Sequence, residues 1–195
     1  MEADLASRIE KLDEPQRVAF AAACCERVFP AYETFSKDVN WGDVGHLREA
    51  LDLAWGSPVG EPSDEQKVRQ LLECCNGVVP DLDNRFDSDF AAPAQNAAIA
   101  VMRTLESTRD GSAERAARVG DLALDAVEAY VDLAFGEGAL YDAVAVERNP
   151  AVEAERRDQE DSLERLEKST LDASLLDGLR LQARRSGFWV IEPSA

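Results

Sequence analysis

Residues 15–35 of this chain read PQRVAFAAACCERVFPAYETF, and the interval from Val18 to Cys25 carries no charge in a sequence that is otherwise 31% charged. At the period of an α-helix, apolar side chains cover two faces of this segment. One face holds Val18, Ala22, Cys25, Phe29 and Tyr32, and the other holds Phe20, Cys24, Val28 and Phe35. Because a surface helix has a single apolar stripe, a helix with two such faces is normally surrounded by neighbours. The segment predicts the buried central helix of an all-α domain.

Pro30 falls inside this helical pattern. Because proline lacks an N–H and its ring clashes with the preceding turn, we expect a kink or a break near residues 27–29, with residues 31–37 as a separate helical turn. Glu26 and Arg27 interrupt the apolar run beside this proline. A buried charge is costly unless it is paired. We expect both to pair with a neighbouring helix or to satisfy backbone freed by Pro30; the alternative is a functional site at the kink.

Helical periodicity also covers most of the remaining chain. The predicted helices span residues 4–12, 15–35, 43–55, 63–75, 93–108, 112–135, 151–168 and 172–185. Asp13, Ser63, Ser112 and Asn149 are the expected N-caps, with a capping box at residues 63–66. The strongly charged helix 151–168 is expected on the outside, and residues 188–191 (FWVI) are the one β-type run. The expected fold is a multi-helix bundle around a buried, proline-kinked central helix.

Size and charge limit the classes of function. With 195 residues and a hydrophobic content of 45%, residues 1–195 are most simply one helical domain. The net charge of -18 repels a phosphate backbone, which argues against direct binding of nucleic acid. The same charge attracts a basic protein, although acidity also serves solubility alone. A basic protein partner or a second copy of the chain is therefore the expected kind of partner.

We expect neither a targeting segment nor a membrane segment from this sequence. The first residues, MEADLASRIEKLDE, lack a basic leader and an apolar run, so we expect no signal peptide. No window approaches the roughly 18 apolar residues of a membrane span. We expect a cytoplasmic protein whose four cysteines are thiols in a reducing compartment.

The two cysteine pairs, 24–25 and 74–75, raise the possibility of a zinc or redox site. Adjacent residues on a helix point about 100° apart, so a CC pair does not chelate as a CxxC loop does. Cysteine is also among the residue types most often buried. We therefore interpret these cysteines as small core side chains and expect no metal.

Other candidate motifs are incomplete. His46 is the only histidine, which excludes paired-histidine metal motifs, and we expect it to be solvated. Asp81, Asp83, Asp87 and Asp89 fail the EF-hand pattern because Phe86 stands where glycine is needed. The segment GEGA at 136–139 follows a helix and lacks a third glycine, so it is no nucleotide loop. We assign no catalytic, cofactor-binding or metal-binding residue and expect no cofactor.

Several short segments occur in the order typical of one bacterial family. They are RIEKL at 8–12, VAF at 18–20, CERVFP at 25–30, WGD at 41–43, LDLAW at 51–55, NPAVE at 149–153 and LR at 179–180. With these, the chain resembles the YjaG-type family of unknown function along essentially its whole length. Cys-Glu-Arg-x-x-Pro is the best marker, whereas Cys24 and the alanine-rich, acidic composition depart from the pattern. The resemblance implies a cytosolic, all-helical protein and supplies no activity.

Two functional hypotheses follow. The first is a non-catalytic interaction protein whose acidic helical surface binds a basic partner, for example by neutralising a basic toxin or nuclease. The second is an enzyme or small-ligand binder with a pocket at the kinked helix, around Glu26, Arg27 and Tyr32. Because no catalytic motif accompanies these residues, the sequence favours the first hypothesis over an enzyme.

Overall fold

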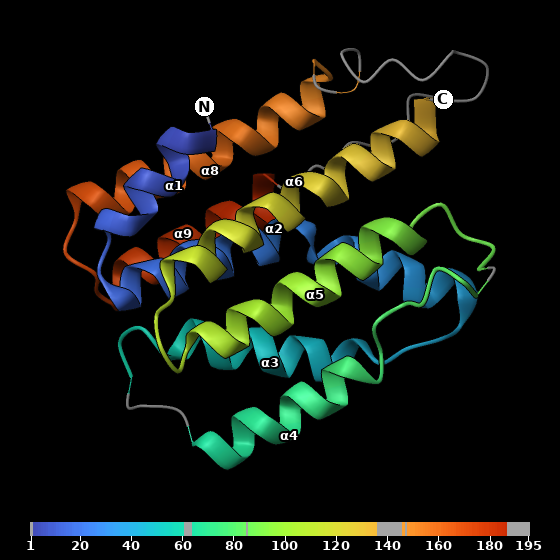
Figure 1. Ribbon diagram of the computed structural model, residues 1–195, viewed down its shortest axis with the longest axis horizontal. Coiled ribbons are helices and arrows are strands. Elements are labelled where there is room, and N and C mark those ends of the chain that lie inside the picture. Colours follow the sequence, from blue (N-terminus) through green and yellow to red (C-terminus); the bar gives the residue numbers. More distant parts are fainter. Residues whose placement is uncertain (1, 61–63, 85, 136–145, 147, 187–195) are drawn as a thin grey trace.

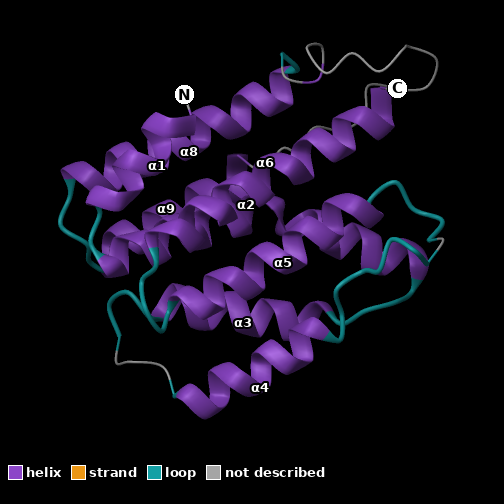
Figure 2. Cartoon of the chain, in the orientation of Figure 1, coloured by secondary structure: helices purple, strands orange, loops and turns teal. Residues whose placement is uncertain are grey.

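The structure is a computed structural model that describes residues 2–60, 64–84, 86–135, 146 and 148–186, and this part of the chain contains helices and no strand (Figures 1 and 2). The helices are α1 (Glu2–Lys11), α2 (Glu14–Val39), α3 (Val44–Gly56), α4 (Glu65–Asn76), α5 (Ala91–Ser107), α6 (Ala113–Phe135), α8 (Pro150–Lys168) and α9 (Ala173–Ser186). The predicted all-α fold is confirmed. That residues 1–195 form one domain stays a prediction.

Helix α2 lies at the centre of the bundle. It contacts α3, α5, α6, α8 and α9, while α1 and α8 form one edge of the molecule and α4 the opposite edge (Figure 1). Every residue from Val18 to Phe29 is buried, as the two apolar faces predicted. Most of the stability of a helix enclosed in this way comes from tertiary packing rather than from the intrinsic helix propensity of its residues.

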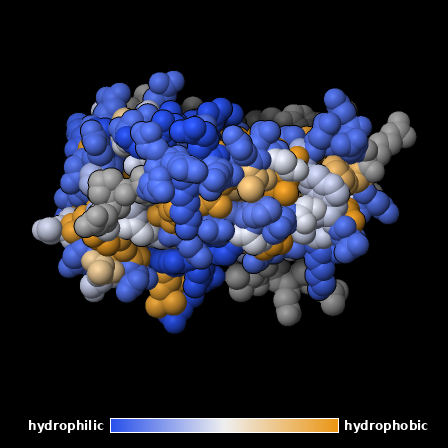
Figure 3. Space-filling view, turned by 90° about the horizontal axis from the view of Figure 1, so that it is seen from below, coloured by the Kyte–Doolittle hydropathy of each residue, from blue (hydrophilic) through white to orange (hydrophobic). Residues whose placement is uncertain are grey.

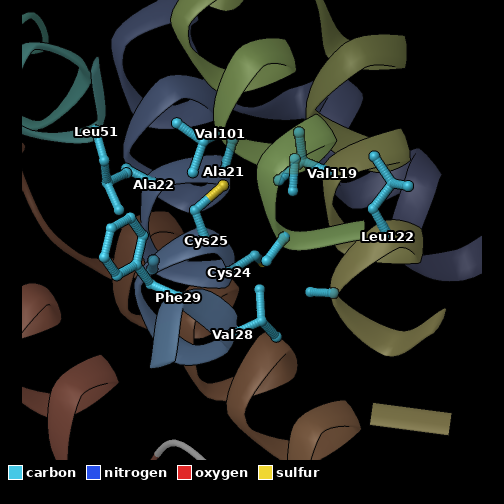
Figure 4. Close-up of a cluster of buried hydrophobic side chains, with 14 of the residues drawn as sticks. Ala21, Ala22, Cys24, Cys25, Val28, Phe29, Leu51, Val101, Val119 and Leu122 are labelled. Atoms are coloured by element: carbon cyan, nitrogen blue, oxygen red, sulfur yellow. The ribbon is translucent and has the colours of Figure 1, made fainter. Parts of the chain in front are cut away.

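Small side chains allow the neighbouring helices to approach α2 closely. In the core, Ala21, Ala22, Cys25 and Val28 of α2 face side chains of three other helices, namely Leu51 of α3, Val101 of α5, and Val119 and Leu122 of α6 (Figure 4). These residues are between 0% and 4% exposed. Because buried apolar surface contributes about 25 cal/mol per Å², this interior supplies the main driving force for folding.

Of the kink or break expected near residues 27–29, the break does not occur, and the expectation of a separate helical turn over residues 31–37 is wrong. Helix α2 continues through Pro30 to Val39 as one element of 26 residues. Phe29 before the proline and Ala31, Tyr32 and Phe35 after it are all buried, so packing on both sides outweighs the roughly 3 kcal/mol that proline costs in a helix interior. The kink itself stays a prediction.

Most helix starts agree with the sequence. Asp13 and Gln16 form a complete capping box at α2, and the Asn149 side chain caps α8. The Ser63 cap is corrected, because α4 begins at Glu65 and the Asp64 carboxylate accepts the Gln66 amide at 2.8 Å. Helix α5 begins at Ala91, two residues before the predicted start.

Two further expectations concern the β-type run near the C-terminus and the membrane. The β-type run at 188–191 lies outside the described residues. Of the helices in the described ranges, none combines the length and the apolar character needed to cross a bilayer.

Candidate functional site

Arg27 of α2 and Glu155 of α8 form a buried ion pair. The Arg27 Nε and Nη2 groups each donate to a Glu155 carboxylate oxygen at 2.8 Å, and the two side chains are 2% and 4% exposed. Arg27 also donates to Cys24 Sγ at 3.3 Å, and Gln159 donates to Glu155 at 2.9 Å. Burial lowers the pKa of Arg27, but the Glu155 carboxylate outweighs burial and the pKa lies above its ordinary value. The guanidinium therefore stays charged.

Glu26 forms a second buried charge centre, on another side of α2. Its carboxylate accepts hydrogen bonds from three side chains, Arg48 at 2.8 Å, Trp55 Nε1 at 2.8 Å and Arg184 at 2.9 Å. Arg180 Nε lies 3.5 Å from the same carboxylate. Burial raises the pKa of Glu26, but these donors together lower it below its ordinary value. The carboxylate is ionised and fully engaged.

Glu26 and Arg27 connect α2 to different neighbouring helices through ion pairs. Consecutive residues on a helix point about 100° apart, so Glu26 and Arg27 meet different neighbours. Glu26 joins α2 to α3 and α9, and Arg27 joins α2 to α8. The expectation that both charges pair with neighbouring helices is confirmed.

Tyr32, the third residue of the predicted pocket, is also engaged. Its hydroxyl donates to the Val78 carbonyl at 2.7 Å, and burial raises the pKa of Tyr32 to about 12. Gly42, in the turn between α2 and α3, lies close to this hydroxyl. Its φ is +89°, and a Cβ atom at this position would collide with the Tyr32 oxygen. Tyr32 therefore holds the loop at Val78 through its hydroxyl, and glycine is required at position 42 by both its backbone angle and the nearby Tyr32 oxygen.

Two open hollows on the described surface are lined mainly by polar and charged residues. One, of about 330 Å³, lies between α8 and α9, and the other, of about 520 Å³, lies between α3 and α4. Neither is lined by Glu26, Arg27 or Tyr32. The half-exposed His46 lines the second hollow, beside Asp43.

The cysteines are free thiols, and the expectation that all four are core side chains is right for three of them and wrong for Cys74. Cys24, Cys25 and Cys75 are buried and Cys74 is exposed. Burial raises the pKa of Cys24 to about 12 and that of Cys75 to about 12. Within the described ranges, no group of three or more histidine, cysteine or acidic residues has a geometry that could hold a metal ion.

Sequence reasoning missed the partners of the two buried charges. Glu155 lies in the strongly charged helix that was expected on the outside of the molecule. One face of this helix, α8, is nevertheless buried and includes Val152, Glu155, Gln159, Leu163 and Leu166. The spacing of these positions is helical. A search for polar residues in register with Val152, Leu163 and Leu166 could have found Glu155.

The fold and these contacts define the class: an all-helical bundle whose buried charges join its helices. The chain belongs to the family described as "Protein of unknown function (DUF416)", whose model matches residues 4–190. It is similar to the uncharacterized protein YjaG of Escherichia coli K12, at 30% identity over 92% of this chain and 91% of that protein. YjaG of Salmonella typhimurium LT2 matches at the same identity and coverage. The expected family resemblance is confirmed.

A solved structure supports the fold. The crystal structure of a DUF416 family protein from Shewanella baltica OS155 is similar, with a TM-score of 0.81 and 27% identity over 93% of this chain and 94% of that one.

Proposed function

We propose that this protein is a non-catalytic interaction protein whose acidic surface binds a basic protein partner. The observation that carries the proposal is the division of charge between interior and surface. The buried charges are compensated inside the molecule, where Arg27 neutralises Glu155 and three arginines surround Glu26. Much of the net charge of -18 is therefore carried by the surface.

Many exposed carboxylates form no ion pair within the described part of the chain. Among the described residues, those that are exposed and form no ion pair include Glu10, Glu33, Asp38, Glu73, Asp81, Asp83, Asp87, Asp89, Glu160 and Asp177. The face in Figure 3 is accordingly mainly hydrophilic, with hydrophobic residues in separate patches. An uncompensated acidic surface steers and binds a partner of opposite charge.

The same charge bears on the kind of partner. Two copies of an acidic surface repel each other, so a basic protein is favoured over a second copy of this chain. A basic toxin or nuclease is one such partner, since helices that carry carboxylates can imitate the charge of a phosphate backbone.

The alternative hypothesis, an enzyme or small-ligand binder with a pocket around Glu26 and Arg27, receives less support. These two side chains are 3% and 2% exposed and their charged atoms are occupied by neighbouring helices. A group that must take up or release a proton from a substrate needs access to that substrate. We therefore do not propose it.

The proposal is tested by a pull-down from cytosolic extract at low salt, eluted with rising salt and analysed by mass spectrometry. We expect one basic protein, released at intermediate salt because exposed charge pairs are screened. A folded protein that retains nothing basic would overturn the proposal.

A further inference from the structure

We propose that the partner docks a Lys/Arg-rich segment on one end of the molecule, which we call the Trp41 surface. It consists of two exposed apolar side chains and four exposed aspartates, namely Trp41, Leu82, Asp81, Asp83, Asp87 and Asp89. This inference rests on the proposed function and assigns it a place. The turn after α2 and the loop before α5 meet at this end, on the right in Figure 1.

Trp41 is an apolar anchor held by other rings. Its centroid lies 6.0 Å from that of Phe35, edge to face, and 5.4 Å from that of Phe86. The Phe35 and Phe86 rings in turn lie 5.0 Å apart. Despite these contacts Trp41 is 37% exposed, and Leu82 is 46% exposed. Exposed aromatic side chains in a fixed position are enriched at protein interfaces.

Hydrogen bonds near both ends of the aspartate-bearing loop before α5 hold this loop beside Trp41. Tyr32 fixes Val78, and Gln95 donates to the Pro80 carbonyl at 2.7 Å. At the far end of the loop, Ser88 Oγ donates to Asp38 of α2 at 3.0 Å. Because the loop is held in the unbound protein, docking loses less conformational entropy.

The charge of this end determines the occupant. Residues 81–89 contain four aspartates and one arginine, a net charge of -3. None of the four aspartates forms an ion pair with the part of the chain that the structure describes. Lysine and arginine suit such a surface because their stems cover apolar area while their charged ends reach carboxylates.

The same combination of contacts occurs inside this molecule. The Arg180 guanidinium lies 5.8 Å from the ring centroid of Trp55 and pairs with the Asp52 carboxylate. The Arg48 guanidinium lies 3.8 Å from the Phe29 ring centroid and pairs with Glu26. We infer that the partner's basic side chains use Trp41 and the loop aspartates in this manner.

The test is an NMR titration of the full chain with an amidated octapeptide of alternating lysine and arginine. We expect the indole N–H of Trp41 and the amides of residues 81–84 and 86–89 to shift most. The Trp41 signal is assigned with Trp41→Phe. Shifts spread evenly over the acidic surface would overturn the inference.

Two variants of equal charge sharpen the test. The first carries Asp81→Asn, Asp83→Asn, Asp87→Asn and Asp89→Asn, in which each amide keeps an oxygen acceptor. The control carries Glu10→Gln, Glu73→Gln, Glu160→Gln and Asp177→Asn, at exposed positions on helices α1, α4, α8 and α9. We expect the Kd for the peptide to rise about tenfold in the first variant and about twofold or less in the control.

The outcomes separate the two proposals. Equal changes in both variants would overturn the Trp41 surface and leave the acidic interaction surface standing. Failure of the pull-down to recover a basic protein would overturn the proposed function whatever the peptide does.

Discussion

Arg27 and Glu155 lie 128 positions apart in the chain and share two hydrogen bonds of 2.8 Å, so one fully buried ion pair joins α2 to α8. Removing one partner leaves the other charge buried and uncompensated. We expect Arg27→Met to lower the free energy of unfolding by about 3–5 kcal/mol. Urea denaturation at neutral pH measures this change.

A double variant and an exposed pair are the controls for this prediction. Arg27→Met combined with Glu155→Leu should recover much of the loss, because no unpaired charge remains. Lys67→Met breaks a pair whose side chains are 52% and 53% exposed, and should cost about 0–1 kcal/mol. A cost for Arg27→Met as small as that of Lys67→Met would show that the buried pair is not a structural joint.

Glu26 should make the fold sensitive to acid. Its pKa in the folded protein lies below the ordinary value of 4.5, so it stabilises the fold above pH 4.5 and loses this contribution as the pH falls through the folded pKa. We expect the free energy of unfolding to fall below pH 4.5, and to fall less in Glu26→Gln. Urea denaturation over a pH series measures both slopes, with the exposed Glu33→Gln as control. Equal slopes in all three proteins would contradict this role.

Gly42 should tolerate no side chain. Gly42→Ala forces a residue with a Cβ into φ +89° and against the Tyr32 hydroxyl, and we expect a loss of about 2 kcal/mol. In a Tyr32→Phe background the loss should be smaller, because the colliding oxygen is gone. Gly56→Ala, where no atom lies within 4 Å of the added Cβ, should change stability by less than about 1 kcal/mol. Thermal unfolding of these variants measures the differences, and an equal loss at both glycines would refute the contact.

The four thiols should differ sharply in reactivity. Cys74 is exposed, whereas burial removes Cys24, Cys25 and Cys75 from solvent and raises their pKa values. Since the thiolate is the reactive form, we expect one fast-reacting thiol in the native protein and the others only after unfolding. A coloured disulfide reagent measures the rate, and Cys74→Ser should remove the fast phase. A second fast thiol in the native protein would contradict the burial of Cys24, Cys25 and Cys75.

The sequence predicted the features that depend on local periodicity and capping. The two apolar faces of residues 18–35 identified the central helix, and Asp13 and Asn149 marked helix starts correctly. The predicted break at Pro30 was wrong, because the packing that buries Phe29 and Tyr32 on either side of the proline is a tertiary effect that local pattern does not reveal.

The contacts of the buried charges were beyond prediction from local pattern alone. Arg48 and Arg184, which donate hydrogen bonds to Glu26, lie 22 and 158 residues away from it in the chain, and no local pattern connects them. The Trp41 surface likewise depends on a contact between the rings of Trp41 and Phe86, which lie in different segments of the chain. Such pairs are set by the packing of helices, whereas the charges themselves were visible in the sequence.

The most direct test of the acidic interaction surface is a calorimetric titration of the basic protein recovered by the pull-down, repeated as salt is raised from about 0.05 M to about 0.3 M. We predict that binding weakens about tenfold or more over this range, because the Debye length shortens from about 14 Å to about 6 Å and exposed charge pairs are screened. Binding that is independent of salt, or absent with the purified protein, would contradict the proposal.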